Sequence, residues 1–154
     1  MPRIALFPGS FDPVTVGHVD IVKRSAPLFE KIVIGVGINS TKQTMFSLEQ
    51  RIKWLQETFA DLPKVEVHSY EGLTVDFCKK CNAQYILRGL RTSTDFQFEK
   101  AIAQMNQLLQ NEIETVFILS SPQYSPVSST IVRDIIRHGG DVKQFLPSTV
   151  IPKL

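Results

Sequence analysis

The segment Thr15-Val16-Gly17-His18 has the residue types and the spacing to take part in phosphate chemistry. A histidine in the first turn of a helix, next to a glycine that lets a phosphate approach, is placed to stabilise a charged phosphorus centre. The loop before it adds a glycine turn and the Ser10 hydroxyl, so free backbone N–H groups can receive an anion. Spacing alone leaves open that His18 is only an exposed residue at a helix start.

A second cluster, Arg88-Gly89-Leu90-Arg91, is expected directly after a strand. Two arginines on either side of a glycine can hold phosphate oxygens through paired N–H groups. The alternative is a solvated loop with surface charge, but the expected place at the ligand-binding edge of a sheet favours phosphate binding. Lys42, in the loop after the second strand, adds a third cation to the same edge.

A third cluster, of hydroxyl side chains, lies between Tyr124 and Thr130 at the start of the last predicted helix. Taken alone, these hydroxyls are best interpreted as a helix N-cap and its neighbours. The same helix N-terminus would also receive a triphosphate, because its free N–H groups point toward the ligand.

The remaining reactive side chains fit structural roles. Cys78 and Cys81 have C-x-x-C spacing, but they lie late in a helical stretch and no second pair completes a zinc site. His68 and His138 lack a comparable context. The sequence shows neither a nucleophile arrangement for a covalent intermediate nor a carboxylate cluster for a metal. Cations, hydroxyls and helix N-termini instead suit phosphoryl or nucleotidyl transfer by positioning and charge stabilisation.

Short apolar runs alternate with helical patterns along the whole chain. The runs are rich in β-branched residues and mostly continuous, which favours strands covered on both faces. The predicted strands are Arg3–Phe7, Lys31–Ile38, Val65–Ser69, Tyr85–Leu87 and Thr115–Leu119. The predicted helices run from about residue 17 to Ser25, from Leu48 to Phe59 after a capping box of Ser47 and Gln50, through Thr74–Cys81, along the repeat of Phe98, Ile102, Met105 and Leu109, and from about Ser128 to Gly139.

This alternation predicts an α/β fold with a doubly wound, parallel, five-stranded sheet. Ligands of such sheets bind beyond the carboxyl ends of the strands. The loops that matter are therefore 8–17, 39–46, 70–74, 88–95 and 120–128, and each of the three clusters begins in one of them.

Length and charge limit the classes of protein that remain. The chain has 154 residues, which predicts a single domain over residues 1–154. The net charge of +2 lacks the broad positive field of a nucleic-acid binder, so no nucleic-acid partner is expected. No apolar run approaches the roughly 20 residues of a membrane span, and no signal-peptide core is visible. We therefore expect a cytoplasmic protein without a membrane partner.

Taken together, the clusters resemble one family, the bacterial phosphopantetheine adenylyltransferases. The T/HxGH pattern at 15–18 alone indicates only the nucleotidyltransferase superfamily, whereas Arg-Gly-Leu-Arg with its following Asp-Phe and Glu is more particular. The resemblance covers about residues 3–150. It depends on Gly9–Pro13, Thr15–His18, Arg88–Arg91 with Asp95, Phe96 and Glu99, Met105–Asn106, Val127–Thr130, and Gly140–Val142 with Phe145–Pro147.

The resemblance implies a Rossmann-like nucleotidyltransferase fold and an adenylyltransferase that uses Mg²⁺, held mainly by phosphates rather than by protein ligands. ATP and 4′-phosphopantetheine would give dephospho-coenzyme A and pyrophosphate, a step of coenzyme A biosynthesis, by in-line attack without a covalent enzyme intermediate. Members of the family are typically homohexamers and can bind coenzyme A as a feedback inhibitor.

The same resemblance implies a role for each matching residue. His18 would stabilise the transition state, Ser10 and Lys42 would hold the attacking phosphate, and Arg91 would act with them. The residues implied to bind phosphopantetheine are Ser10, Lys42, Thr74 and Arg88. The residues implied to bind ATP are Ser10, Phe11, His18, Gly89, Leu90, Arg91, Glu99, Tyr124, Ser125, Pro126, Val127, Ser128, Ser129 and Thr130.

Two alternatives stay open at this point. One is a sister nucleotidyltransferase with another acceptor, such as nicotinamide mononucleotide or glycerol 3-phosphate, and the segment from Arg88 to Arg91 argues against it. The other is a module that binds ATP without catalysis, and the intact motif from Thr15 to His18 argues against that.

Overall fold

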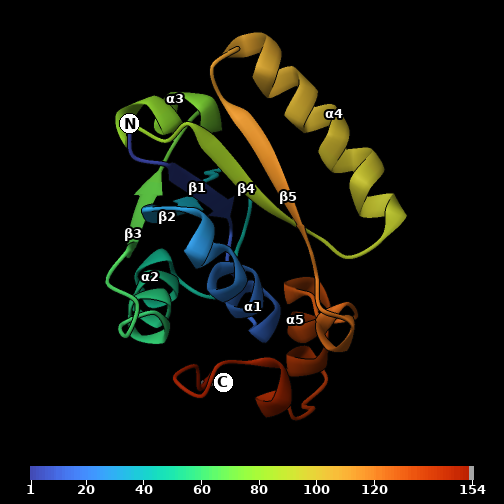
Figure 1. The fold of residues 1–154 in the computed structure, drawn as a ribbon. Helices are drawn as coiled ribbons and strands as arrows, with labels where there is room; N and C mark the ends of the chain where they lie inside the picture. The colour runs from blue at the N-terminus through green and yellow to red at the C-terminus, as the bar shows by residue number, and fades with distance from the viewer. Residues whose placement is uncertain (153–154) are drawn as a thin grey trace.

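Five strands form one parallel sheet in the order β3-β2-β1-β4-β5. The computed structural model describes residues 1–152, and Figure 1 shows helices interleaved with the strands. The strands are β1 (Ile4–Gly9), β2 (Lys31–Gly37), β3 (Val65–Tyr70), β4 (Tyr85–Leu90) and β5 (Glu114–Leu119). The helices are α1 (Val16–Ser25), α2 (Leu48–Thr58), α3 (Thr74–Lys80), α4 (Ser93–Leu109) and α5 (Ser129–Arg137). The predicted parallel α/β fold is confirmed.

Alternate side chains of the central strands enter two separate cores, one on each face of the sheet. Ala5 and Phe7 of β1 pack in the core that includes residues of α1, α2 and α5. Leu6, between them, packs instead with Val75 and Cys78 of α3. Because both faces of β1 and β2 are covered, these strands read as continuous apolar runs in the sequence.

The edge strand β3 differs from the expectation that the strands are covered on both faces. Along β3, half-buried Val65 and Val67 alternate with exposed Glu66 and His68. The strand has a neighbour only on the β2 side, and Glu66 pairs in solvent with Lys31 and His68. Burial on one face alone produces the alternating pattern, and the prediction of a fully covered strand was wrong here.

Strand β4 is longer than predicted. It continues three residues past Leu87 to Leu90, because each of its six residues pairs with a residue of β5. Arg88 and Gly89 therefore lie inside a strand rather than in the loop directly after it, and that part of the prediction was wrong. Placement in a strand gives the Arg88 side chain a fixed direction from the sheet, which a loop would not.

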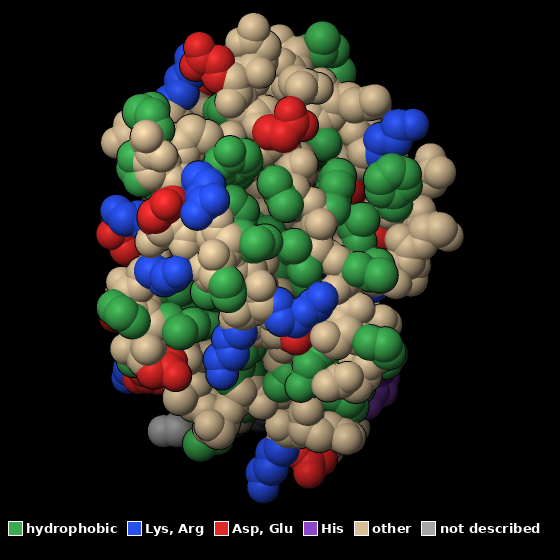
Figure 2. Space-filling view, viewed as in Figure 1, with side chains coloured by type: hydrophobic (Ala, Val, Ile, Leu, Met, Phe, Trp, Pro, Cys, Tyr) green, Lys and Arg blue, Asp and Glu red, His purple; other side chains and the backbone are tan. Residues whose placement is uncertain are grey.

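Helix α4 has the predicted apolar repeat, but the structure leaves this repeat uncovered. None of the described residues of α4 is buried, and Phe98 is 68% exposed. Figure 2 shows hydrophobic side chains gathered where α4 and the strands β4 and β5 lie. No helix within residues 1–152, α4 included, is long and apolar enough to cross a membrane. The exposed apolar residues here are Phe96, Phe98, Ile102, Met105, Leu108 and Leu109, with Leu119 of β5.

Strand β2 depends on a close approach at Gly35. A Cβ atom at Gly35 would lie 2.8 Å from Leu6 Cδ1 and 3.0 Å from Tyr70 Cε1, whereas a Cβ at Gly37 would find its nearest neighbour at 3.7 Å. We predict that Gly35→Ala lowers the free energy of unfolding by roughly 1–3 kcal/mol, because the core is overpacked. Gly37→Ala, on the same strand under the same tyrosine, should change it by about 0.5 kcal/mol or less. Urea denaturation measures both, and equal losses would contradict the close approach.

Candidate active site

His18 lies in the first turn of α1, where a capping box holds its ring. The Thr15 backbone N–H donates to His18 Nδ1 at 2.9 Å, and the Thr15 hydroxyl accepts from the His18 backbone N–H at 3.4 Å. Because Nδ1 accepts, the proton of the neutral ring is on Nε2. The predicted box at α2 forms only by its first bond, from Gln50 N–H to the Ser47 hydroxyl. Among the helices described, α1 has the complete capping box. The His18 side chain therefore both caps the start of α1 and offers its Nε2–H as a hydrogen-bond donor.

The surroundings of His18 keep it neutral. Burial, together with the smaller effects of the positive charges of Arg88 and Arg91, lowers the pKa of His18 from its usual 6.5 to about 4. At neutral pH the ring therefore offers an uncharged N–H donor. The neutral His18 ring can donate to a phosphate when one is bound. In the absence of a ligand it adds no positive charge that would repel Arg88 and Arg91.

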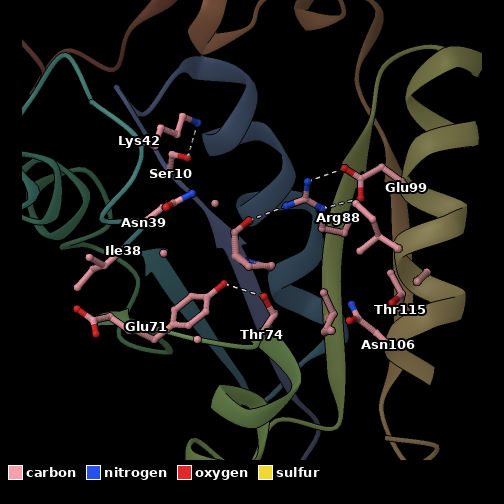
Figure 3. A pocket seen from close by; sticks show the side chains of 18 of the residues that line it. Ser10, Ile38, Asn39, Lys42, Glu71, Thr74, Arg88, Glu99, Asn106 and Thr115 are labelled. Carbon is pink, nitrogen blue, oxygen red and sulfur yellow. Dashed lines mark hydrogen bonds and ion pairs between the residues drawn. The ribbon is translucent and has the colours of Figure 1, made fainter. Parts of the chain in front are cut away.

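Arg88 is held across the site by three hydrogen bonds. Its Nε and Nη2 donate to the two carboxylate oxygens of Glu99 at 2.9 and 2.5 Å, and its Nη1 donates to the Pro8 carbonyl at 2.7 Å (Figure 3). A guanidinium has five N–H groups, so two remain for a ligand. Arg91 has a simpler partner: its Nε forms an ion pair with Asp95 Oδ2 at 3.2 Å, and its backbone N–H donates to the same oxygen at 3.1 Å. Both arginines are thus oriented before any phosphate arrives.

Lys42 reaches the same place from the loop after β2. Its Nζ donates to the Ser10 hydroxyl at 3.5 Å, a long hydrogen bond (Figure 3). The sequence prediction that Lys42 and the first loop share one edge of the sheet is confirmed. The ammonium group is exposed, so it is accessible to a ligand.

The hydroxyl cluster sits at the N-terminus of α5. Ser128 caps the helix by accepting from the Ile131 N–H at 3.2 Å, as the sequence predicted. The Ser129 hydroxyl donates to the Pro13 carbonyl at 2.8 Å, which fastens this helix end to the first loop. Residues at the N-termini of α1 and α5 therefore line the same cavity, and the first turn of each helix has backbone N–H groups without a partner inside the helix.

Two cavities meet at this edge of the sheet. The larger, of about 650 Å³, extends toward α3 and α4 and includes Thr74 in its lining. The smaller, of about 330 Å³, lies between the N-termini of α1 and α5 and includes His18. The residues that line both cavities are Pro8, Gly9, Ser10, Lys42, Arg88 and Glu99. A group bound in one cavity therefore meets a group bound in the other at these cations and this hydroxyl.

Most of the predicted site residues line these cavities. The smaller cavity is lined by Ser10, Phe11, His18, Lys42, Arg88, Gly89, Arg91, Glu99, Tyr124, Val127, Ser128, Ser129 and Thr130. Among the residues described, Leu90, Ser125 and Pro126 are not part of either lining. Leu90 is the last residue of β4, and its neighbours Gly89 and Arg91 take the places at the cavity.

Several lining residues were not predicted to have a role. Tyr70 donates or accepts a hydrogen bond with Thr74 at 3.0 Å and stacks on Phe77, so it forms one wall of the larger cavity. Asn106 of α4 also lines that cavity. Arg133 of α5 lines the smaller one and donates to the Asp12 carbonyl at 2.8 Å. Their residue types are common in any sequence, and only the fold brings them to the cavities.

The remaining reactive side chains have structural surroundings. Cys78 is a buried free thiol, and burial raises its pKa to about 12. His138 ends α5 and bonds to the Asp134 carbonyl at 2.8 Å. Within residues 1–152 no three histidine, cysteine, aspartate or glutamate side chains group to hold a metal ion.

Comparison with known proteins agrees with this site. Residues 6–135 match the model of the cytidylyltransferase-like family. A phosphopantetheine adenylyltransferase of Flavobacterium psychrophilum is 57% identical over 96% of this chain and 97% of its own, and one of Flavobacterium johnsoniae is 56% identical over the same shares. A crystal structure of a bifunctional NMN adenylyltransferase/ADP ribose pyrophosphatase from Francisella tularensis shares the fold, with a TM-score of 0.74 at 17% identity, over 97% of this chain and 46% of that one.

The fold is thus that of the nucleotidyltransferases. The chain belongs to the cytidylyltransferase-like family and, within it, to the phosphopantetheine adenylyltransferases.

The lowered pKa of His18 predicts how stability depends on pH. In the unfolded chain the imidazole takes up a proton near pH 6.5, whereas in the folded protein it stays neutral down to about pH 4. Protonation thus favours the unfolded chain as the pH falls through this range, and the effect is absent above it. We expect the free energy of unfolding to fall less between about pH 7 and pH 5 in His18→Gln than in the unchanged protein. Urea denaturation at several pH values measures this, and parallel curves would contradict the buried neutral ring.

Proposed function

We propose that this protein transfers the adenylyl group of ATP to 4′-phosphopantetheine, giving dephospho-coenzyme A and pyrophosphate, in the biosynthesis of coenzyme A. The observation that carries the proposal is the junction of two cavities at Ser10, Lys42 and Arg88, with His18 beside it. Such a junction suits a reaction between two bound phosphate groups. The names of the relatives at 57% and 56% identity agree with this reaction.

The smaller cavity is proposed to hold ATP. The N-termini of α1 and α5 present free N–H groups to it, and a triphosphate is the anion that such paired helix ends favour. Arg91 and the hydroxyls from Ser128 to Thr130 add charged and neutral donors. Tyr124 and Val127, which line this cavity, would then lie beside the nucleoside.

The larger cavity is proposed to hold phosphopantetheine. Its inner end has the cations Lys42 and Arg88, which suit the phosphate. Its outer part combines the Ile102 side chain with the polar groups of Thr74 and Asn106. This mixture suits an arm in which amide groups alternate with methylene groups.

The attacking phosphate is already an anion, so the reaction needs no strong general base. The obstacle is the repulsion between two phosphate groups, which Lys42, Arg88 and Arg91 would offset. The His18 Nε2–H would donate to an oxygen of the α-phosphate as negative charge develops on it, and Ser10 would orient the attacking group. Direct in-line attack then forms the new phosphoanhydride bond as the bond to pyrophosphate breaks, with no covalent enzyme intermediate.

The reaction is proposed to use Mg²⁺ that arrives with the phosphates of ATP. The carboxylates that line the smaller cavity, Asp12, Asp95 and Glu99, are occupied by N–H donors of the chain. This donor set fits a metal held mainly by phosphate oxygens. When bound, Mg²⁺ would withdraw charge from the triphosphate.

The proposal includes the setting in which the enzyme works. Coenzyme A contains both the pantetheine arm and the adenylyl group, so it would occupy the same two cavities and act as a feedback inhibitor. A cytoplasmic location and the lack of nucleic-acid and membrane partners agree with the near-neutral charge of +2. The proposed assembly is a homohexamer; the exposed apolar face of α4 supports association of this chain with other copies, because such association would remove that face from water.

An acceptor assay tests the proposed reaction. We expect pyrophosphate release from ATP and Mg²⁺ with phosphopantetheine, and little with nicotinamide mononucleotide or glycerol 3-phosphate. His18→Ala should lower kcat by about 10²–10³-fold, because it removes one donor to the transition state, while ATP affinity stays within about tenfold. ATP binding without acceptor-dependent release would identify a non-catalytic module instead. A large loss of ATP binding in His18→Ala would show that His18 acts mainly in the ground state.

The oligomeric state tests the role of α4. Met105→Glu places a charge on the exposed apolar face, so it should convert a particle of six chains into smaller species, because burying an unpaired carboxylate is unfavourable. Leu28→Glu, at an exposed apolar residue away from α4, is the matched control and should leave the particle intact. Light scattering after size-exclusion chromatography measures both. An unchanged mass for Met105→Glu would remove α4 from the interface.

A further inference from the structure

The loop that bears Lys42 has few contacts of its own. Between the end of β2 at Gly37 and the start of α2 at Leu48, residues 40–43 are exposed. Lys42 itself bonds to Ser10 through its Nζ and to the Asn39 carbonyl through its backbone N–H. Neither contact is enough to place a long, flexible side chain, so the position of the ammonium group depends on how the rest of the loop is held.

The carboxylate of Asp12 holds the far end of this loop. Asp12 is 3% exposed, and its two oxygens accept from the backbone N–H groups of Met45 at 2.8 Å and Phe46 at 2.9 Å. Two charge-assisted bonds to consecutive N–H groups fix both the position and the direction of the backbone three to four residues after Lys42. Asp12 is itself two residues after Ser10, so it connects the two loops that meet at the cavities.

Arg51 of α2 closes the same connection from the other side. It is 5% exposed; its Nε donates to the Phe46 carbonyl at 3.1 Å and its Nη1 to the Ser10 carbonyl at 2.7 Å. Asp12 and Arg51 thus both bind the turn at Phe46, one through its N–H and the other through its carbonyl. The hydrogen bonds of both side chains go to backbone groups, and Arg133 Nη1 lies 3.9 Å from Asp12 Oδ2.

We propose that Asp12 and Arg51 are positioning residues for adenylyl transfer, which act by clamping the Lys42 loop to Ser10. This inference deepens the proposed function. With the clamp in place, the ammonium group and the hydroxyl lie together where the two cavities meet. Without it, Met45 and Phe46 keep only their apolar packing against the core and Trp54, which does not fix the direction of the backbone, and Lys42 spends less time near the transferred phosphate.

The substitution that tests the clamp is Asp12→Asn. An amide of the same size has one acceptor oxygen, so either Met45 N–H or Phe46 N–H must face an NH₂ group. We expect kcat to fall by about 10–100-fold while the KM for ATP changes by less than about threefold, since the disturbed bonds go to the Lys42 loop, whereas the Asp12 carbonyl that accepts from Arg133 of α5 is kept. Arg51→Lys keeps the positive charge, but one ammonium group cannot replace the two fixed bonds to the Phe46 and Ser10 carbonyls. This variant should also lower kcat while it leaves the KM for ATP nearly unchanged. It also serves as the second variant if Asp12→Asn does not fold.

A double-mutant cycle separates positioning from general damage. If the clamp acts through Lys42, adding Asp12→Asn to Lys42→Ala should lower kcat by less than about threefold more. Lys64→Met is the matched control, because Lys64 bridges the carbonyls of Ala26 and Phe29 at 2.7 and 3.0 Å away from the cavities. It should cost stability without changing kcat. If the fold-losses of kcat in Asp12→Asn and in Lys42→Ala simply multiply in the double variant, the proposal is wrong.

A measurement without substrates distinguishes failure of the clamp from failure of the proposed function. Amide hydrogen exchange of the unliganded protein should be at least about tenfold faster at Met45 and Phe46 in Asp12→Asn, while the core strands exchange as before. Unchanged hydrogen exchange at Met45 and Phe46 would contradict the proposed clamp, independently of which reaction the enzyme catalyses. A lack of acceptor-dependent turnover in the unchanged protein would reject the reaction and leave this result standing.

Discussion

Repulsion between two phosphate groups is the constraint to which the rest of this structure responds. Cations must be gathered at one point to offset it, yet gathered cations repel each other in the empty protein. The structure meets both demands by giving each arginine a carboxylate. Arg88 is paired with Glu99 and Arg91 with Asp95, so each guanidinium is oriented and partly neutralised before a ligand binds. These pairs hold both arginines at one site of a chain whose net charge is only +2.

The parallel sheet is what makes such a gathering feasible. Every strand ends at the same edge, so loops distant in sequence converge there, and the order β3-β2-β1-β4-β5 places the first loop at the centre. Hydrogen bonds between the loops then adjust their positions. The same side chains often serve both purposes: His18 starts α1 as well as facing the cavity, and Ser129 fastens α5 to the loop before α1.

Much of the fold could be predicted from the sequence because the interactions that determine it are between residues close together in the chain. Buried strands β1 and β2 and helix α3 were predicted within about a turn, since continuous apolar runs and helical spacing act over a few residues. The length of β4 was not predicted correctly, because pairing with β5 extends the strand beyond its apolar run. The apolar face of α4 was recognised correctly as a pattern, but periodicity does not state what covers that face, and within one chain nothing buries it.

The sequence by itself determined which residue types are available for phosphate chemistry and which strand ends present them: the histidine at a helix start, the arginines near Gly89 and the hydroxyls before α5. These follow from neighbours a few positions apart. Only the tertiary structure decided that Asp12 binds a loop more than thirty residues away, that Arg51 in an ordinary helix reaches Ser10, and that Arg88 is paired. Such contacts depend on how the strands are ordered and how the loops pack, and no local pattern encodes them.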